Sequence, residues 1–280
     1  MSYLNRGWNN AFSSIKKHKG LFVLIIILQI IFVASSLALG AQYLLKILEN
    51  TQGIIGPLEN ANYDSQKIEQ GEAFTPDYAS IYNSYQAMLK NVLVFMLCMA
   101  ALFLLLNGII WLLSHWIMQE KKPWKVRIKE ALPFLLKAWA AIFILLVPFK
   151  IAGYYILLHF IRASQSFSNL TVVLKGLLIA SFVIYYFLLV ALAVAPYSSW
   201  KKFVAKWAKL SVLQFQKTAV IFLIIMVALL ISFAALYAGT EYTESVPLLL
   251  ILGSLCMIML AVTRIFWIAS LQEIDTVSSR

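Results

Sequence analysis

Charged residues are scarce in this chain. Only 12% of its 280 residues are Asp, Glu, Lys or Arg, whereas 62% are hydrophobic. A soluble domain of this length carries about 25% charged residues, because its surface must be covered by groups that water solvates. The composition therefore excludes a soluble globular protein and indicates that lipid surrounds most of the chain.

Cysteine is nearly absent, and the common catalytic and metal-binding motifs are missing. Cys98 and Cys256 fall within long apolar runs and lack the spacing of a disulfide framework or a zinc site. The three histidines are far apart in the sequence. No Gly-rich phosphate loop, nucleophile elbow or HExxH pattern occurs. The sequence thus predicts no cofactor and no metal, and it supports a non-catalytic role better than an enzyme.

Six apolar runs are long enough to cross a bilayer as helices. About 20 apolar residues span the hydrocarbon core, because a helix rises about 1.5 Å per residue and the core is about 30 Å thick. None of the runs alternates as a membrane strand does. The sequence predicts an all-α integral membrane protein with one polytopic domain over 1–280. The predicted spans are approximately 21–45, 91–117, 139–161, 173–196, 219–238 and 246–269.

The charges are divided unequally between the two ends of these spans. With a cytoplasmic N-terminus, 17 of the 23 Lys and Arg residues flank the cytoplasmic ends, five flank the other ends, and Lys150 lies within a span. Eight of the 12 acidic residues lie on the side opposite to the cytoplasm. This positive-inside pattern predicts a cell-membrane protein with both termini in the cytoplasm. Lysines at span ends favour anionic lipid headgroups as partners, rather than nucleic acid.

The tryptophans follow the same division. All eight fall at or near the predicted cytoplasmic ends, whereas many tyrosines fall towards the other side. Amphipathic aromatic rings favour the membrane interface. The pattern therefore predicts an aromatic belt that anchors the protein and binds no ligand.

Three lysine-rich segments lead into apolar runs in the same way. Aligning Lys17, Lys137 and Lys217 predicts three two-span hairpins, over about 1–124, 125–200 and 201–280. The alternative is that the three segments only enter the membrane in the same way, and this would produce the same pattern without triplication of one ancestral unit. Apolar residues at helical spacing in the first and third segments predict amphipathic elbow helices in the cytoplasmic headgroup plane. These residues are Leu4, Trp8, Phe12 and Ile15, and Trp200, Val204, Trp207 and Leu210.

The predicted outer loop, about 46–90, is the only sizeable segment outside the spans. A Gly- and Pro-containing stretch that ends at Pro57 indicates a turn after the first span. Thr75-Pro76-Asp77 predicts the start of a helix that continues into the second span. Three roles are open for this loop: a solvated connector, a small helical cap, or a docking surface for a protein partner.

One cation, Lys150, lies in the middle of an apolar run. It comes about ten residues, or about 15 Å, after the cytoplasmic boundary of its span. A charged lysine at that depth costs roughly 2.5 to 3.5 kcal/mol, and the preceding Pro148 frees a backbone carbonyl. Two interpretations are open: Lys150 binds an anionic group in a polar cavity, or it bonds to freed carbonyls and locks the bundle. Possible ligand-binding companions at comparable depths are Asn107, Gln29, Tyr185 and Tyr186.

No Asp or Glu occurs inside any of the six predicted spans. Proton-coupled and cation-coupled transporters usually rely on buried carboxylates, and so do intramembrane aspartyl enzymes. The sequence therefore favours a non-catalytic scaffold, accessory subunit or lipid-interacting membrane domain. The alternative is a transporter or channel for an anionic or amphipathic solute, with Lys150 in the pathway. Arg264, near an inner boundary, is expected to extend its guanidinium towards the interface.

The layout of lysine-led hairpins resembles that of a known family. It is similar to the six-helix membrane domain associated with bacterial and archaeal glycerophosphodiester phosphodiesterases, and to the uncharacterised stand-alone relatives of that domain. The resemblance covers most of the chain and implies a membrane domain without the phosphodiesterase, because no acidic metal-binding soluble domain is present. Mitochondrial carriers also contain three hairpins. Their P-x-[DE]-x-x-[KR] signature is missing, because the nearest match, from Pro196 to Lys201, lacks the acid.

Overall fold

Every regular element is helical in the part of the chain that the structure describes. The computed structural model describes residues 2–60, 77–119, 124–163, 167–196, 199–242 and 245–278. Six of its helical segments are long and apolar enough to cross a membrane, which confirms the all-α class and the predicted number of candidate spans. They are Lys19–Glu59, Tyr78–Met118, Lys125–Ile156, Thr171–Val194, Phe215–Tyr242 and Val246–Val277.

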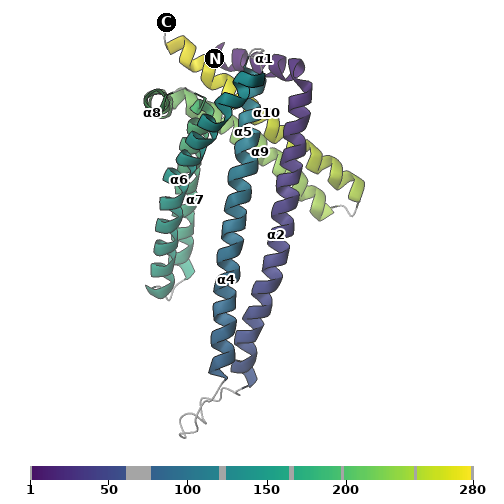
Figure 1. Cartoon of the computed structure of the whole chain (residues 1–280), viewed down its shortest axis with the longest axis vertical. Coiled ribbons are helices and arrows are strands. Elements are labelled where there is room, and N and C mark those ends of the chain that lie inside the picture. The colour runs from purple at the N-terminus through teal and green to yellow at the C-terminus, as the bar shows by residue number, and fades with distance from the viewer. Residues whose placement is uncertain are drawn as a thin grey trace. The chain divides into compact units, whose positions relative to one another are not determined.

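One of these segments, Tyr78–Met118, is built from more than one helical element (Figure 1). Two of the elements, η1 and η2, are π-helical turns, a type that occurs mostly as a short bulge within α-helices. The elements in chain order are α1 (Ser2–Lys17), α2 (Lys19–Asn60), α4 (Tyr78–Leu102), η1 (Phe103–Asn107), α5 (Gly108–Met118), α6 (Trp124–Ala163), α7 (Phe167–Val194), α8 (Trp200–Ala208), η2 (Lys209–Leu213), α9 (Phe215–Tyr242) and α10 (Val246–Ser278).

The chain forms two compact units. Unit 1 comprises Met1–Gln29 and Gly108–Arg280, and unit 2 comprises Ile30–Asn107. One boundary falls inside α2 and the other falls between η1 and α5. The units therefore do not coincide with the three predicted hairpin segments.

Unit 2 consists of most of α2 together with α4 and η1. The predicted turn ending at Pro57 is wrong, because α2 continues to Asn60. Gly53 serves close packing instead, since a Cβ there would overlap the Ser84 hydroxyl of α4. The helix after the loop begins at Tyr78, with the Asp77 carboxylate accepting a hydrogen bond of 3.0 Å from the Ser80 N–H. Most of the predicted loop is thus helical, while Thr75 and Pro76 lie outside the described residues.

The C-terminal end of α7 lies at the centre of unit 1. The last carbonyls of a helix have no partner within it, so other groups must satisfy them where the end is buried. Here, side chains from four other helices donate to carbonyls of this region. The bonds are Trp207 Nε1 to Phe187 (3.0 Å), Trp267 Nε1 to Leu189 (3.0 Å), His115 Nε2 to Leu192 (3.0 Å) and Lys137 Nζ to Ala195 (3.4 Å). The α7 terminus thus joins α5, α6, α8 and α10.

This arrangement corrects the interpretation of the tryptophans. Trp111, Trp116 and Trp267 are buried in the protein, so they do not line a lipid-facing belt. Trp8 and Trp200 remain about half exposed. Sequence position alone could not separate the two groups, because an indole ring suits both a membrane interface and a core where its N–H finds a carbonyl.

The predicted elbow segments form helices, but the three lysine-led segments differ. The first is α1, separated from α2 at His18, and the third is α8 with η2, separated from α9 at Gln214. The second is continuous with the apolar part of α6. Within unit 1, α6 packs along α7 and α9 packs along α10 (Figure 1). Their placement relative to a headgroup plane remains a prediction.

Candidate functional site

Lys150 lines a cavity of about 340 Å³ between α6 and α7. Its polar lining consists of Lys150, Ser181 and Tyr185. The apolar lining residues are Leu146, Phe149, Leu178, Phe182 and Ile184. A cationic group is therefore surrounded mainly by hydrocarbon and aromatic side chains.

Helical periodicity brings these residues to one place. Lys150 and Leu146 are four residues apart on α6, and Leu178, Ser181 and Tyr185 are separated by three and four residues on α7. Residues at such spacing share one face of a helix. Gly153 lies about one turn further along α6, where a Cβ would meet Leu177 at 3.5 Å. The two faces therefore lie against one another, with the cavity beside their contact.

The cavity offers two free hydrogen-bond donors. Lys150 is exposed and makes no hydrogen bond or ion pair with the described residues. The Tyr185 hydroxyl also has no hydrogen bond within that part of the chain. Ser181 already donates to the Leu177 carbonyl at 2.7 Å, so its oxygen is left to accept. An ammonium and a phenol are suited to an anionic oxygen, and no described contact of Lys150 supports the interpretation that it locks the bundle.

Arg264, a second cation within a candidate span, lies on α10 and does not line the Lys150 cavity. Its guanidinium carbon lies 5.4 Å from the centroid of the Trp111 ring. Its Nη1 atom is buried without a hydrogen-bond partner among the described residues. The guanidinium therefore lies against the buried Trp111 ring, and its reach to the membrane interface stays a prediction. In the sequence, the position of Arg264 within an apolar run was the signal for a buried contact of its side chain.

The structure brings together only two of the five predicted site residues. Lys150 and Tyr185 line the same cavity, whereas the adjacent Tyr186 is buried and serves the fold. Its hydroxyl donates to the Ser211 carbonyl at 3.1 Å and lies 2.5 Å from the Thr218 hydroxyl. Gln29 and Asn107 do not line this cavity. The amide group of Gln29 is buried and has no hydrogen-bond partner in the described part of the chain.

The remaining titratable groups do not form a recognisable metal centre. Among the described residues, no three or more His, Cys, Asp or Glu side chains are grouped so that they could hold a metal ion. No protein-family model, curated protein or solved structure matches the chain. Functional interpretation of the cavity therefore depends on its own geometry and chemistry.

Proposed function

We propose that this protein is a non-catalytic, lipid-interacting domain of the cell membrane, and that the Lys150 cavity holds the acidic group of an amphiphile. The observation that carries the proposal is the unpaired ammonium of Lys150 in a cavity with mainly apolar walls. A carboxylate or phosphate would offset the cost of a cation at this depth. The apolar walls would contact the hydrocarbon chain of the same molecule.

The position of the cavity favours access from lipid. Two of its walls, Leu178 and Phe182, are 59% and 41% exposed, so the cavity opens at the surface of the α6 and α7 pair. All of its lining residues belong to these two helices. A transport pathway would have to continue through the protein to both sides of the membrane, and this cavity does not supply such a path. Lateral binding of an amphiphile is therefore the function that the geometry supports best.

The binding proposal is tested by identifying lipids that remain bound after extraction in mild detergent. We expect native mass spectrometry to find an acidic amphiphile on the wild type and on Lys150→Arg, and to find it lost from Lys150→Leu. Lys175→Leu is the matched control, because it removes a lysine of α7 that does not line the cavity. Lys150→Leu should unfold at the same temperature as the wild type or higher, since no partner of Lys150 is left unpaired.

Two outcomes would count against this function. The same acidic molecules on all four proteins would show that Lys150 does not select them. A Lys150→Leu protein that is unstable while Lys175→Leu is normal would instead support a structural role for Lys150.

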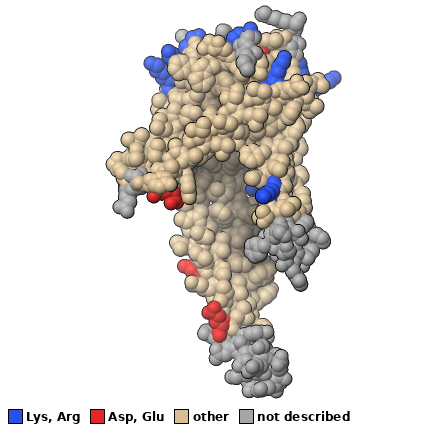
Figure 2. Space-filling model, turned by 180° about the vertical axis from the view of Figure 1, so that it is seen from behind, with Lys and Arg blue, Asp and Glu red and all other residues tan. Residues whose placement is uncertain are grey.

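The proposed topology has both termini in the cytoplasm and three parallel hairpins. On the face shown in Figure 2, Lys and Arg atoms gather mainly at the end where α1 lies, as expected from the positive-inside pattern. The aligned residues Phe12, Leu132 and Val212 are also similarly exposed, at 50%, 62% and 62%, which supports a threefold repeat. These features favour placing that end at the cytoplasmic face, where anionic headgroups lie.

Cysteine labelling in whole cells tests this orientation. In a Cys98→Ala/Cys256→Ala background, we expect Glu59→Cys to react with an impermeant maleimide in intact cells. Lys201→Cys should react only after the cells are opened. Both positions are exposed in the structure, so access is set by the membrane. The reverse labelling pattern would invert the topology without affecting the interpretation of Lys150.

A further inference from the structure

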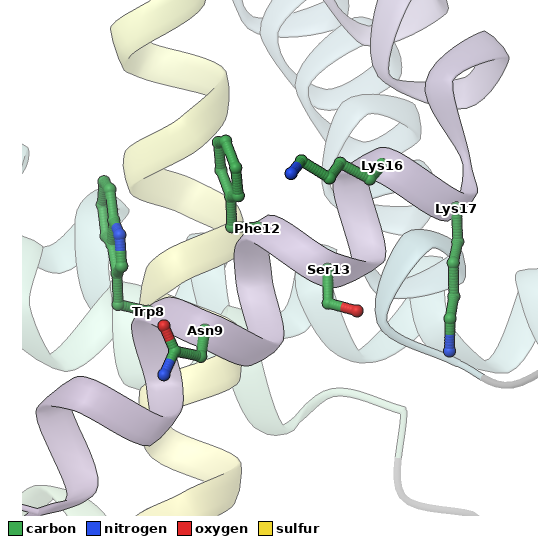
Figure 3. Close-up of a pocket in the computed structure, with 6 residues that line it drawn as sticks. All are labelled: Trp8, Asn9, Phe12, Ser13, Lys16 and Lys17. Carbon is green, nitrogen blue, oxygen red and sulfur yellow. The ribbon is translucent and has the colours of Figure 1, made fainter.

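A groove follows the outer face of α1. It has a volume of about 400 Å³ and is lined by α1 residues alone: Trp8, Asn9, Phe12, Ser13, Lys16 and Lys17. Trp8, Phe12 and Lys16 succeed one another along one side of the helix (Figure 3), and Lys16 Nζ lies 4.7 Å from the centroid of the Phe12 ring. Trp8 and Phe12 are 49% and 50% exposed. We call these six residues the α1 groove.

Contacts with α10 determine how the α1 groove is oriented. The Trp8 ring packs edge-to-face on Phe266, with centroids 5.6 Å apart. Arg6 and Asn10, by contrast, contact Glu273, which lies about two turns closer to the C-terminal end of α10. Because α10 is a candidate span, the aromatic side of α1 faces the apolar length of that span and the polar side faces its end. An amphipathic helix at a membrane interface has this orientation.

Small residues hold α1 in this position. A Cβ at Gly7 would lie 3.0 Å from the Cα of Ser270 and would overlap its hydroxyl, so α1 approaches the α10 backbone closely. Ala11, one turn later, is 2% exposed. The closest contact with α10 therefore uses the small residues of α1, and of the six residues of the α1 groove it is Trp8 whose ring also meets α10, at Phe266.

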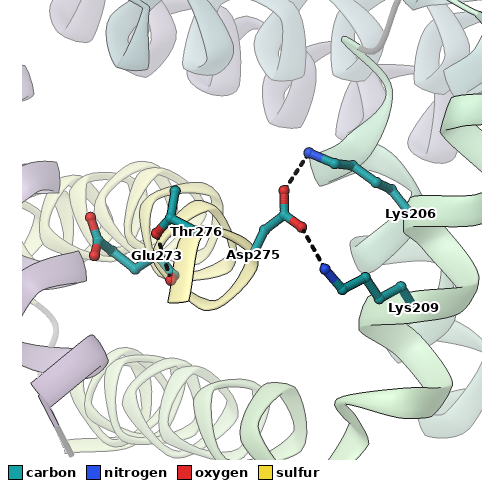
Figure 4. A network of polar contacts seen from close by, with 5 residues as sticks. All are labelled: Lys206, Lys209, Glu273, Asp275 and Thr276. Atoms are coloured by element: carbon teal, nitrogen blue, oxygen red, sulfur yellow. Dashed lines mark hydrogen bonds and ion pairs between the residues drawn. The ribbon is translucent and has the colours of Figure 1, made fainter. Parts of the chain in front are cut away.

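The charges at the α1 groove are not balanced by the protein. Lys16 and Lys17 form no ion pair with any described residue, and the first acidic residue of the chain is Glu49. The lysines of α8 and η2 differ, because Lys206 and Lys209 both pair with Asp275 (Figure 4). Two neighbouring cations of α1 are thus left for an anion outside the described chain.

We infer that the α1 groove is a binding site for an anionic phospholipid of the cytoplasmic leaflet. The ammonium groups of Lys16 and Lys17 contact the phosphate, and the Ser13 hydroxyl, about one turn before them on the helix, is an additional donor. Trp8 and Phe12 contact the glycerol and the upper part of the acyl chains. A phospholipid fits better than a soluble phosphate, because only a lipid uses both the cations and the aromatic surface.

This inference rests on the proposed membrane embedding, but it is independent of the Lys150 cavity. Substitutions at the two places therefore separate the proposals. Loss of the amphiphile from Lys150→Leu should leave phospholipid binding at the α1 groove unchanged. Loss of phospholipid from α1 variants should likewise leave the Lys150 ligand in place.

The test measures binding of phosphatidylglycerol and phosphatidylcholine with identical chains to the purified full-length protein by native mass spectrometry. For Lys16→Gln/Lys17→Gln we expect about 10- to 30-fold weaker binding of one phosphatidylglycerol and no change for phosphatidylcholine, since each lysine near an anionic surface contributes about 1 kcal/mol. Lys201→Gln/Lys202→Gln is the matched control, an adjacent exposed pair on α8. It should bind like the wild type.

Two further measurements distinguish a lipid-binding site from nonspecific electrostatic attraction. Phe12→Ala should weaken phosphatidylglycerol binding without a change in charge, and soluble glycerol phosphate should not displace the lipid. Equal binding by the wild type and Lys16→Gln/Lys17→Gln would overturn the inference, and so would equal losses in both double variants. Displacement by glycerol phosphate would instead assign the groove to a soluble anion. Unchanged unfolding temperatures would show that the double variants are folded.

Discussion

The helices α1 and α8 are both fastened to the end of α10, but their cations have different surroundings. Glu273 accepts a hydrogen bond of 2.8 Å from Asn10 and pairs with Arg6 at 3.5 Å on the α1 side. Asp275 pairs with two lysines on the α8 side. Residues two apart on a helix point in different directions, so these acids hold two separate elements. The lysines of α8 and η2 that Asp275 binds join two helices, whereas Lys16 and Lys17 at the end of α1 pair with no described acid.

The two elbows also differ in how their bends are held. After α8, the chain passes through η2 and bends at Gln214 before α9. The Tyr186 hydroxyl reaches into this bend from α7 and contacts both the Ser211 carbonyl and the Thr218 hydroxyl. The bend between α1 and α2 is bridged by backbone hydrogen bonds around His18. The α8 elbow is thus contacted by a side chain of α7, and the α1 elbow packs mainly on α10.

The largest effect is expected where α1 touches α10. Gly7→Leu should destabilise the protein by about 1 to 3 kcal/mol, because the added side chain has to displace the Ser270 backbone. The measurement is the unfolding temperature in detergent, together with protease sensitivity of residues 2–17. Gly20→Leu is the control, since a Cβ at Gly20 meets nothing within 4 Å. Similar losses from both variants would show that α1 is not held by this contact.

A smaller effect is expected at the acidic residues. Asp275→Asn should cost about 1 kcal/mol, because two lysines lose a partly buried carboxylate. Amide hydrogen exchange should therefore increase in residues 200–213. Glu273→Gln should have a weaker effect, since the Arg6 side chain is 52% exposed and a glutamine oxygen still accepts from Asn10. A larger loss of stability from Glu273→Gln than from Asp275→Asn would show that α1, rather than α8, depends more on its acidic partner in α10.

Hydropathy and periodicity were sufficient for the broad architecture. Runs of apolar residues predicted six candidate spans, and the described part of the chain has six helical segments of suitable length and composition. Helical spacing predicted helices around Trp8 and Trp207, which are α1 and α8. Other local signals gave wrong results for the turn at Pro57 and for several tryptophans. Gly53 packs against Ser84 of α4, and Trp267 donates to the Leu189 carbonyl of α7, and such partners are distant in the sequence.

For the candidate site, the sequence predicted how far along its helix each residue lies, but not to which side of the helix its side chain points. Distance along a helix placed Lys150 and Tyr185 at similar levels, and they line one cavity. Tyr186 has nearly the same depth, but successive residues of a helix are turned by about 100°. It therefore points into the protein, towards Thr218. For Arg264, only the packed structure shows that the guanidinium lies over the Trp111 ring.

The sequence by itself determined that the chain is helical and apolar, that it has six possible spans, and that its cations cluster near their ends. These properties follow from composition and local spacing, because lipid requires each span to satisfy its own backbone. Only the tertiary structure decided which cations are paired. Lys206 and Lys209 meet Asp275, while Lys150, Lys16 and Lys17 meet no described acid. An ion pair depends on the direction of two side chains in space, and that direction is set when helices far apart in the sequence pack together.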